Sequence, residues 1–168
     1  ATEHLIELGH TRIGHIVGPS RDGKPNQRFL GFQRAMQPAG LEIRPDWLWE
    51  GDYSTPSGEA AAEAMLALSD RPTANFSGND EMAIGVMKAA RDAGLDVPRD
   101  LSIVGFDDLA SSRYLTPPLT TIQQPMREIG ARAVHLLLAI IERIDVPLQQ
   151  TLDFSLMVRG STAAPGSR

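Results

Sequence analysis

Residues 101–125 read LSIVGFDDLASSRYLTPPLTTIQQP, and the first part of this stretch decides the fold class. Leu101–Phe106 lacks the apolar–polar alternation of a strand with one wet face, so it predicts a strand buried on both faces, as in parallel sheets. Two carboxylates, Asp107 and Asp108, follow directly. Ligands bind beyond the carboxyl ends of strands in an open parallel sheet. Asp107 is therefore a candidate binding residue.

Outward from this strand, the chain alternates between helical and strand patterns. Strands separated by helices predict an α/β fold, with a parallel sheet, helices on both of its faces and one main core. The expected linkers are residues 117–124 and 145–150, and the tail from Gly160 is expected to be frayed. The patterns predict helices at 1–8, 26–36, 54–69, 81–93 and 125–144, and strands at 12–17, 47–51, 73–77, 101–106 and 152–158.

Composition excludes several classes of protein. With 168 residues, 42% of them hydrophobic, the chain is long enough for one ordinary domain. Its net charge of −5 does not supply the basic surface that phosphate contacts need, so the chain itself is not expected to bind nucleic acid. The absence of cysteine rules out disulfides and thiolate chemistry, and no apolar run is long enough to cross a membrane. The start Ala-Thr-Glu, without an initiator Met, suggests a piece of something longer.

Polar side chains gather where the predicted strands end. Arg28 opens the helix after the first strand, Tyr53 follows the second, Asn79 follows the third and Asp107 ends the fourth. A guanidinium, a flat ring, an amide and a carboxylate would together hold a polyhydroxylated or heterocyclic small molecule. Each also has a purely structural reading: Asn79 or Asp80 as a helix cap, Tyr53 as surface filler, Arg28 as a solvated side chain. Their coincidence on one rim favours a binding site.

Motifs for catalysis and for metal binding are incomplete. Residues 18–24 match the phosphate-loop spacing G-x-x-x-x-G-K, but Pro25 replaces the hydroxyl residue that would hold magnesium and removes a backbone N–H. There is no G-x-S-x-G motif, and the four histidines lack metal-ligand spacing. Asp107 and Asp108 are adjacent on an extended strand end, which makes them a poor acid–base pair. We therefore expect no enzyme activity, no metal and no cofactor.

Several segments resemble the effector-binding core of the LacI/GalR family of transcriptional regulators. They are HLIELGHTRIGHIVGP, RFLGFQRAM, GDYSTPSG, NDEMAIGVMKAARDAGLDVPRDLSIVGFDD, YLTPPLTTIQQP and VRGST, in family order over essentially the whole chain. The resemblance implies a lobe like that of a periplasmic sugar-binding protein, with Arg28, Tyr53, Asn79 and Asp107 contacting a small effector, most often a sugar. It also implies a cytoplasmic homodimer that binds operator DNA through a helix-turn-helix headpiece absent here.

By the same resemblance, residues 1–118 form the carboxyl-terminal lobe. Residues 119–146 are a strand and helix that cross to the missing amino-terminal lobe, and residues 147–168 are the return strand and tail. The loop before Arg28 gives no clear ligand code. A periplasmic sugar-binding protein of a transporter remains the alternative, since it shares the fold, and an enzyme is third.

Two expectations concern assembly. The helix at 81–93 carries apolar residues around more of its circumference than one core face needs, which suggests a homodimer contact. The helix at 125–144 has an apolar stripe too large to stay wet, and we expect a second chain, rather than the helix's own sheet, to cover it. That stripe consists of Ile129, Ala133, Leu136, Leu137, Ile140 and Ile141.

Overall fold

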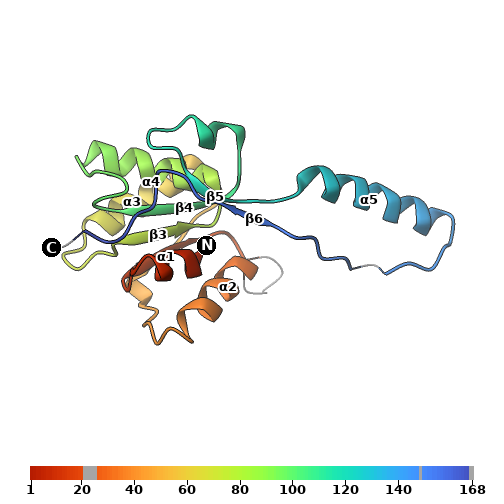
Figure 1. The fold of residues 1–168 in the computed structure, drawn as a ribbon, viewed down its shortest axis with the longest axis horizontal. Coiled ribbons are helices and arrows are strands. Elements are labelled where there is room, and N and C mark those ends of the chain that lie inside the picture. Colours follow the sequence, from red (N-terminus) through yellow and green to blue (C-terminus); the bar gives the residue numbers. More distant parts are fainter. Residues whose placement is uncertain (21–25, 148, 167–168) are drawn as a thin grey trace.

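The computed structural model describes residues 1–20, 26–147 and 149–166, and it is built around one six-stranded sheet (Figure 1). The strand order is β2-β1-β3-β4-β5-β6; β1 to β5 are parallel, and β6 pairs antiparallel with β5. The α/β class is confirmed, with an antiparallel edge strand added. The strands are β1 (Ile13–Val17), β2 (Leu48–Glu50), β3 (Ala74–Ser77), β4 (Ser102–Asp107), β5 (Thr120–Gln123) and β6 (Ser155–Met157).

Two pairs of helices cover the two faces of the sheet, each over its own apolar cluster. On one face, α1 (Thr2–Glu7) and α2 (Gln27–Met36) pack on a cluster that includes Ile13, Phe76 and Val104. On the other face, α3 (Thr55–Leu66) and α4 (Asp80–Asp92) pack on a cluster that includes Ile16 and Ile103. The side chains of β1 and β4 thus contribute to both clusters, which is why the stretch before Asp107 reads as apolar without alternation, whereas β3 contributes Ala74 and Phe76 to the first cluster only. Short 3-10 helices occupy Pro45–Trp47 (η1) and Ala110–Arg113 (η2).

The helices α3 and α4 lie in direct backbone contact, and two glycines make this possible. A Cβ atom at Gly58 would overlap the backbone of Met82, and one at Gly85 would overlap the carbonyl of Thr55. The close packing buries Met82, Val86 and Met87 of α4 within the chain itself. The expectation that the apolar residues Met82, Ile84, Val86 and Met87 are left over for a dimer contact is therefore wrong for the three that are buried, while Ile84 is partly exposed.

The last third of the chain departs from the sequence prediction in two places. β5, within the expected linker 117–124, is a buried strand that pairs with β4. The tail from Gly160 is not frayed: Ser161 is fully buried and bonds to both the backbone N–H and the carbonyl of Ile103, while the carbonyl of Ala163 accepts from the His10 ring. These small polar residues gave no strand or helix pattern, although they complete the edge of the fold.

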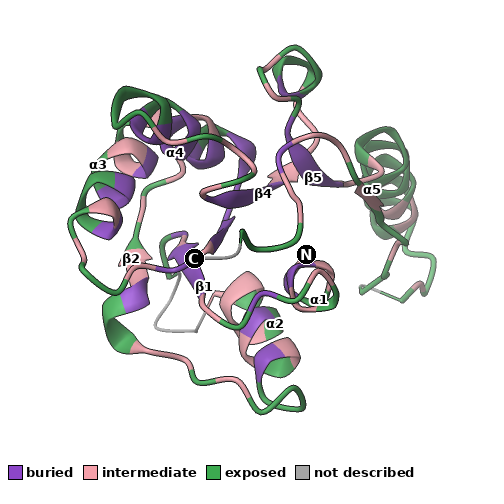
Figure 2. Ribbon diagram, turned by 60° about the vertical axis from the view of Figure 1, so that its left-hand side comes forward, coloured by how far each residue is buried: buried purple, intermediate pink, exposed green. Residues whose placement is uncertain are grey.

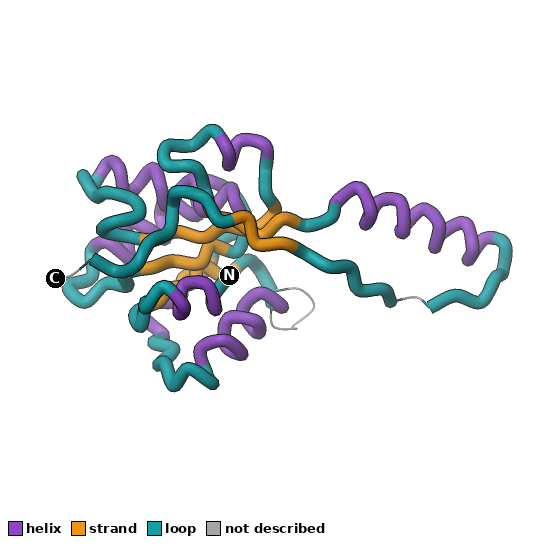
Figure 3. Tube along the Cα trace, in the orientation of Figure 1, coloured by secondary structure: helices purple, strands orange, loops and turns teal. Residues whose placement is uncertain are grey.

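The helix α5 (Met126–Ile141) projects away from the body, and the chain returns beside it to β6 (Figures 1 and 3). No residue of α5 is buried, and exposed surface runs along it (Figure 2). Leu137 and Ile140 are 57% and 49% exposed. The prediction that the sheet of its own chain does not cover this stripe is confirmed. What does cover it stays a prediction.

Candidate functional site

The candidate residues meet at the carboxyl ends of β1, β3 and β4. From β1 the strand order runs outward on both sides, to β2 and to β3, so the junction of β1 and β3 is the topological switch point of the sheet. The N–H of Gly78, just after β3, donates to the carbonyl of Ile16 on β1, at 2.9 Å. The guanidinium of Arg28 reaches across from the first turn of α2 and donates to the carbonyl of Gly78, at 2.8 Å. Arg28 therefore links the start of α2 to the loop after β3, directly over the switch point.

Aromatic rings and a carboxylate hold the Arg28 guanidinium in place. It lies over the ring of Phe106, 4.0 Å from the centroid, and 5.5 Å from the centroid of the Tyr53 ring. Its Nη2 is 3.7 Å from Oδ1 of Asp107. Because the stacking fixes the plane of the guanidinium, its remaining N–H groups have a set direction. Such a fork suits a ligand oxygen or ring nitrogen.

Tyr53 is held in a strained conformation over the end of β1. Its φ is 72°, in the left-handed region that side-chain-bearing residues seldom adopt. A Cβ atom at Gly18 would overlap the Tyr53 ring, so the ring packs directly on the glycine backbone. The hydroxyl accepts a 2.8 Å hydrogen bond from Nδ2 of Asn26. The ring is therefore fixed at both ends.

Asn79 holds Tyr53 from the other side. Its Nδ2 donates to the carbonyl of Tyr53 at 2.9 Å, and its Oδ1 accepts from the backbone N–H of Met82 at 2.9 Å, which caps α4. Only 8% of Asn79 is exposed. The cap that the sequence suggested as the structural alternative is thus present. Its hydrogen bond to Tyr53 joins Asn79 to the other three predicted residues in one connected set. We call this set the strand-tip site: Arg28, Tyr53, Asn79 and Asp107.

Asp107 is the acceptor of the strand-tip site. Partial burial raises the pKa of its carboxyl group, and the nearby Arg28 and Gln124 offset only part of that rise. Its Oδ1 accepts from Nε2 of Gln124 at 2.6 Å, while Oδ2 has no hydrogen-bond partner among the described residues. The φ of Asp107 is 121°, again in the strained region. One carboxylate oxygen is thus open to a ligand, at a residue whose backbone the fold holds against its preference.

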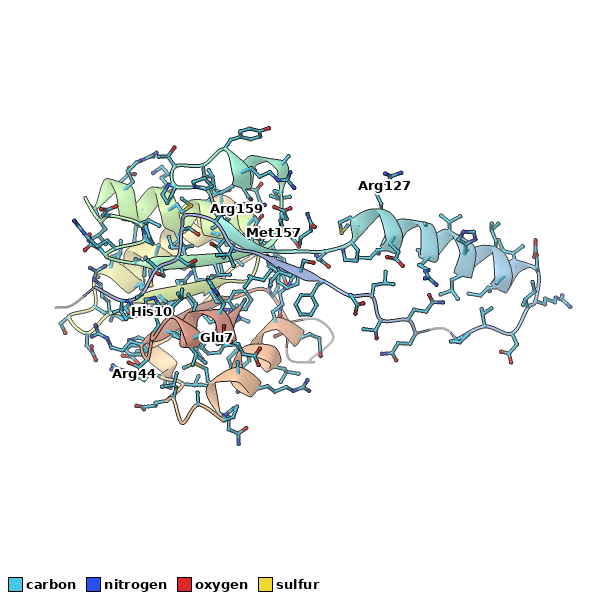
Figure 4. All side chains as sticks on the ribbon, viewed as in Figure 1. Glu7, His10, Arg44, Arg127, Met157 and Arg159 are labelled. Atoms are coloured by element: carbon cyan, nitrogen blue, oxygen red, sulfur yellow. The ribbon has the colours of Figure 1, made fainter. Side chains whose placement is uncertain are left out.

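Two other acidic residues near the site, Asp108 and Asp80, have structural roles instead. Burial would raise the pKa of Asp108, but hydrogen bonds from Arg159, Arg113 and Gln123 outweigh it and the pKa is lowered. Arg159 lies just beyond β6 (Figure 4), and its ion pair with Asp108 connects the end of the chain to the tip of β4. Asp80 is fully buried and accepts hydrogen bonds from β5 and η2.

A cavity of about 880 Å³ adjoins the strand-tip site. Its walls come from α1, α2, α5 and the returning chain, and include Phe32, Ile129, Leu136 and Phe154. Of the strand-tip site, only Arg28 lines it. Because α5 stands apart from the body, this cavity is the space between the two, and it is also lined by Phe106 and Gln124, which surround the strand tips where the polar groups converge.

Sequence reasoning missed three residues of this region: Asn26, Phe106 and Gln124. Asn26 stands in the position of a helix cap, a signal that was visible, but its bond to Tyr53 depends on how two loops meet. The phosphate-loop match and Pro25 fall largely on residues outside the described part of the chain. Among the described residues, no group of acidic, histidine or cysteine side chains could hold a metal ion, and no helix is long and apolar enough to span a bilayer.

A doubly wound lobe with polar groups converging at its switch point defines a small-molecule-binding module. Residues 2–162 match the family model described as a periplasmic binding protein-like domain. The chain belongs to that family, in the form that LacI/GalR transcriptional regulators carry as their effector-binding domain.

Relatives and solved structures agree with this assignment. The chain is 45% identical over 142 residues to the HTH-type transcriptional repressor PurR of Aliivibrio salmonicida, which covers 84% of the chain and 43% of the repressor. It superposes on a dimeric Lac repressor with a TM-score of 0.90 at 37% identity, covering 98% of the chain and 60% of the repressor. A CelR–cellobiose complex gives a TM-score of 0.88 at 33% identity, covering 96% of the chain and 50% of that protein. The chain spans less than half the length of the curated relative.

Proposed function

We propose that this domain binds a small polar effector at the strand-tip site and couples its occupancy to operator binding by a DNA-binding part outside these residues. The observation that carries the proposal is the contact between Arg28, Tyr53 and Asp107 at the switch point of the sheet. A fixed guanidinium beside a carboxylate with one open oxygen recognises a ligand that presents an acceptor next to a donor. Relatives named as HTH-type repressors support the coupling to DNA.

Two classes of effector fit this pattern. A sugar offers adjacent hydroxyls, which both donate and accept, and the neighbouring structure with cellobiose favours this class. A purine offers a ring N–H beside a carbonyl or ring nitrogen, and the relatives named PurR favour it. The flat rings of Tyr53 and Phe106 suit either ligand, because both the face of a sugar and the face of a base stack on aromatic groups. We keep the sugar as the first expectation and the purine as the second.

Calorimetric titration of the full-length protein tests the proposal, with cellobiose, glucose, hypoxanthine and adenine as probes. Saturable binding of one class is expected, together with a change in operator affinity when that probe is present. Arg28→Ala and Asp107→Asn should each weaken binding roughly 10- to 100-fold, because hydrogen bonds to charged groups contribute about 1.5–3 kcal/mol. No binding of any probe, or binding that both substitutions leave intact, contradicts the proposal.

The assembly is part of the same proposal. We expect a cytoplasmic homodimer, with residues 1–118 as one lobe, 119–146 as the crossing segment and 147–168 as the return. The dimeric Lac repressor among the neighbours supports the dimer. The exposed α5 supports a crossing segment that another part of the assembly covers. Analytical ultracentrifugation of the full-length protein at micromolar concentration checks this, and a monomer would contradict it.

A further inference from the structure

We propose that Asn26 is a positioning residue of the strand-tip site, because it sets the Tyr53 hydroxyl to donate a hydrogen bond toward the bound effector. The inference rests on the proposed function and adds to it: the effector must carry an acceptor opposite Tyr53. Three contacts of the Asn26 side chain lead to this conclusion. They involve the Arg28 backbone, the Gly18 carbonyl and the Tyr53 hydroxyl.

The partners of Asn26 assign its amide orientation. One end lies 2.9 Å from the backbone nitrogen of Arg28, which can only donate, so that end is the oxygen. The other end lies 3.2 Å from the carbonyl oxygen of Gly18, which can only accept, so that end is the NH₂ group. Both contacts choose the same orientation, and a flipped amide would fail at both. The NH₂ group is therefore the donor in the 2.8 Å bond to the Tyr53 hydroxyl.

The hydroxyl of Tyr53 is left with a hydrogen to donate. Its oxygen accepts from Asn26, so its own O–H needs an acceptor elsewhere, and none of the described residues provides one. The ring cannot swing away to find one, because it packs on Gly18 and its backbone is tied to Asn79. The O–H is thus presented to water in the free protein and to an effector in the complex.

This fixed donor complements the fixed acceptor of the same site. Asp107 offers an open carboxylate oxygen, while Tyr53 offers a hydrogen, and Arg28 lies in contact with both residues. A ligand with the reverse order of groups would leave both of these partly buried groups unsatisfied, which is how polar sites reject close analogues. Asn26 therefore contributes to specificity without needing to touch the effector.

A spectroscopic comparison tests the positioning without any effector. Residues 1–168 contain two tyrosines, and Tyr114 is 85% exposed, so in a protein of these residues Tyr114→Phe leaves Tyr53 as the only tyrosine at little structural cost. Tyrosine gives a Fermi doublet in ultraviolet resonance Raman spectra. The intensity of its higher-frequency band relative to its lower-frequency band is high when the phenol oxygen accepts a hydrogen bond and low when the hydroxyl donates one to a carboxylate. Asn26→Asp keeps the size and the helix cap but removes the donor hydrogens. The ratio should fall in Asn26→Asp; an unchanged ratio overturns the inference.

A double-mutant cycle tests the consequence for binding, with cellobiose and hypoxanthine as probes. Asn26→Asp and Tyr53→Phe should each weaken binding roughly tenfold, and the double variant should lose no more than either alone. Gln27→Glu is the matched control, since it adds the same charge to the first turn of α2 at an exposed position. Asn26→Ser, which keeps a capping hydroxyl but is too short to reach Tyr53, serves if Asn26→Asp folds poorly.

The outcomes separate the inference from the proposed function. Additive losses in the cycle, or a loss in Gln27→Glu equal to that in Asn26→Asp, overturn the role of Asn26 while effector binding stands. If none of the four probes named for the proposed function binds the wild-type protein, the proposed function fails, and the Raman ratio alone decides whether Asn26 orients Tyr53.

Discussion

Asp80 is a fully buried acid that joins three segments of the chain, and replacing it should unfold the domain more readily than almost any other polar substitution. Its carboxylate accepts from the hydroxyls of Thr121 and Ser112, at 2.5 and 2.6 Å, and from the backbone N–H of Leu109, at 2.8 Å. A Cβ atom at Gly105 would overlap this carboxylate, so the glycine in β4 leaves the space that the Asp80 side chain occupies. The three bonds connect the start of α4 to β5 and η2.

The contacts set the expected size of the effect. Each hydrogen bond to a charged group contributes about 1.5–3 kcal/mol, and each buried donor left unpaired costs about 1–3 kcal/mol, but these contributions overlap. Asp80→Ala removes all three bonds and leaves their neutral donors unpaired, so, with the overlap, we expect a cost of about 4 kcal/mol. Asp80→Asn keeps an oxygen for Ser112 and Leu109 and turns only its NH₂ group toward Thr121. Its expected cost is about 1–2 kcal/mol.

Urea denaturation followed by circular dichroism gives the free energy of unfolding of each variant. The control is Asp92→Asn, in the same helix, where the exposed carboxylate pairs with Lys88 at the surface. Exposed pairs contribute little, so this control should lie within about 0.5 kcal/mol of wild type. If Asp80→Ala were also within 1 kcal/mol of wild type, the carboxylate would not hold these segments together and the reasoning would be wrong.

Three further outcomes follow from exposure and charge. Asp107→Asn should weaken effector binding, as stated above, yet leave the free energy of unfolding equal or slightly higher at neutral pH, because a carboxyl with a raised pKa costs stability once it ionises. In the wild-type protein, binding measured by calorimetry should weaken as the pH falls through that raised pKa. Asp108, whose pKa is lowered, should contribute stability that is lost as the pH falls below about 4, and Arg159→Met should flatten that acid branch of the unfolding curve. The double substitution Leu137→Gln and Ile140→Gln should change the free energy of unfolding by less than about 0.5 kcal/mol, because both side chains are exposed in the single chain. It should also reduce self-association measured by sedimentation. A large destabilisation would contradict the exposed position of α5.

The central elements of the fold could be predicted because their local signals agree with their packing. The strand before Asp107 is apolar on both faces, and the helix caps Asn26 and Asn79 stand directly before their helices. The residue patterns gave no strand at β5, because Pro117 and Pro118 precede it and it is only four residues long, whereas the family resemblance implied a strand within residues 119–146. The tail after Gly160 was missed because its small polar residues carry no period. Its order comes from bonds to β4 and His10, which local sequence does not encode.

The meeting of the four strand-tip residues could be predicted from the sequence, but the hydrogen bonds among them could not. Parallel strands end at one edge of the sheet, so residues just beyond them meet whatever the loops do, and the four predicted residues form a connected set. The roles within the set depend on contacts between loops. Asn79 uses its amide to cap α4 and to hold Tyr53, and Asn26 reaches the Tyr53 hydroxyl from a different loop.

The adjacent acids Asp107 and Asp108 show how such contacts divide identical residues into different roles. Both follow the same buried strand, and nothing in the sequence around them says which will be available. Arg159, brought back by β6 from far along the chain, pairs with Asp108, whose carboxylate is 1% exposed and whose pKa is lowered. Asp107 receives no such partner: Arg28 stays at 3.7 Å, one of its oxygens lacks a partner among the described residues, and its pKa is raised. The ion pair thus anchors the tip of β4, and the returning arginine, already bound to Asp108, leaves one oxygen of the neighbouring carboxylate without a partner among the described residues.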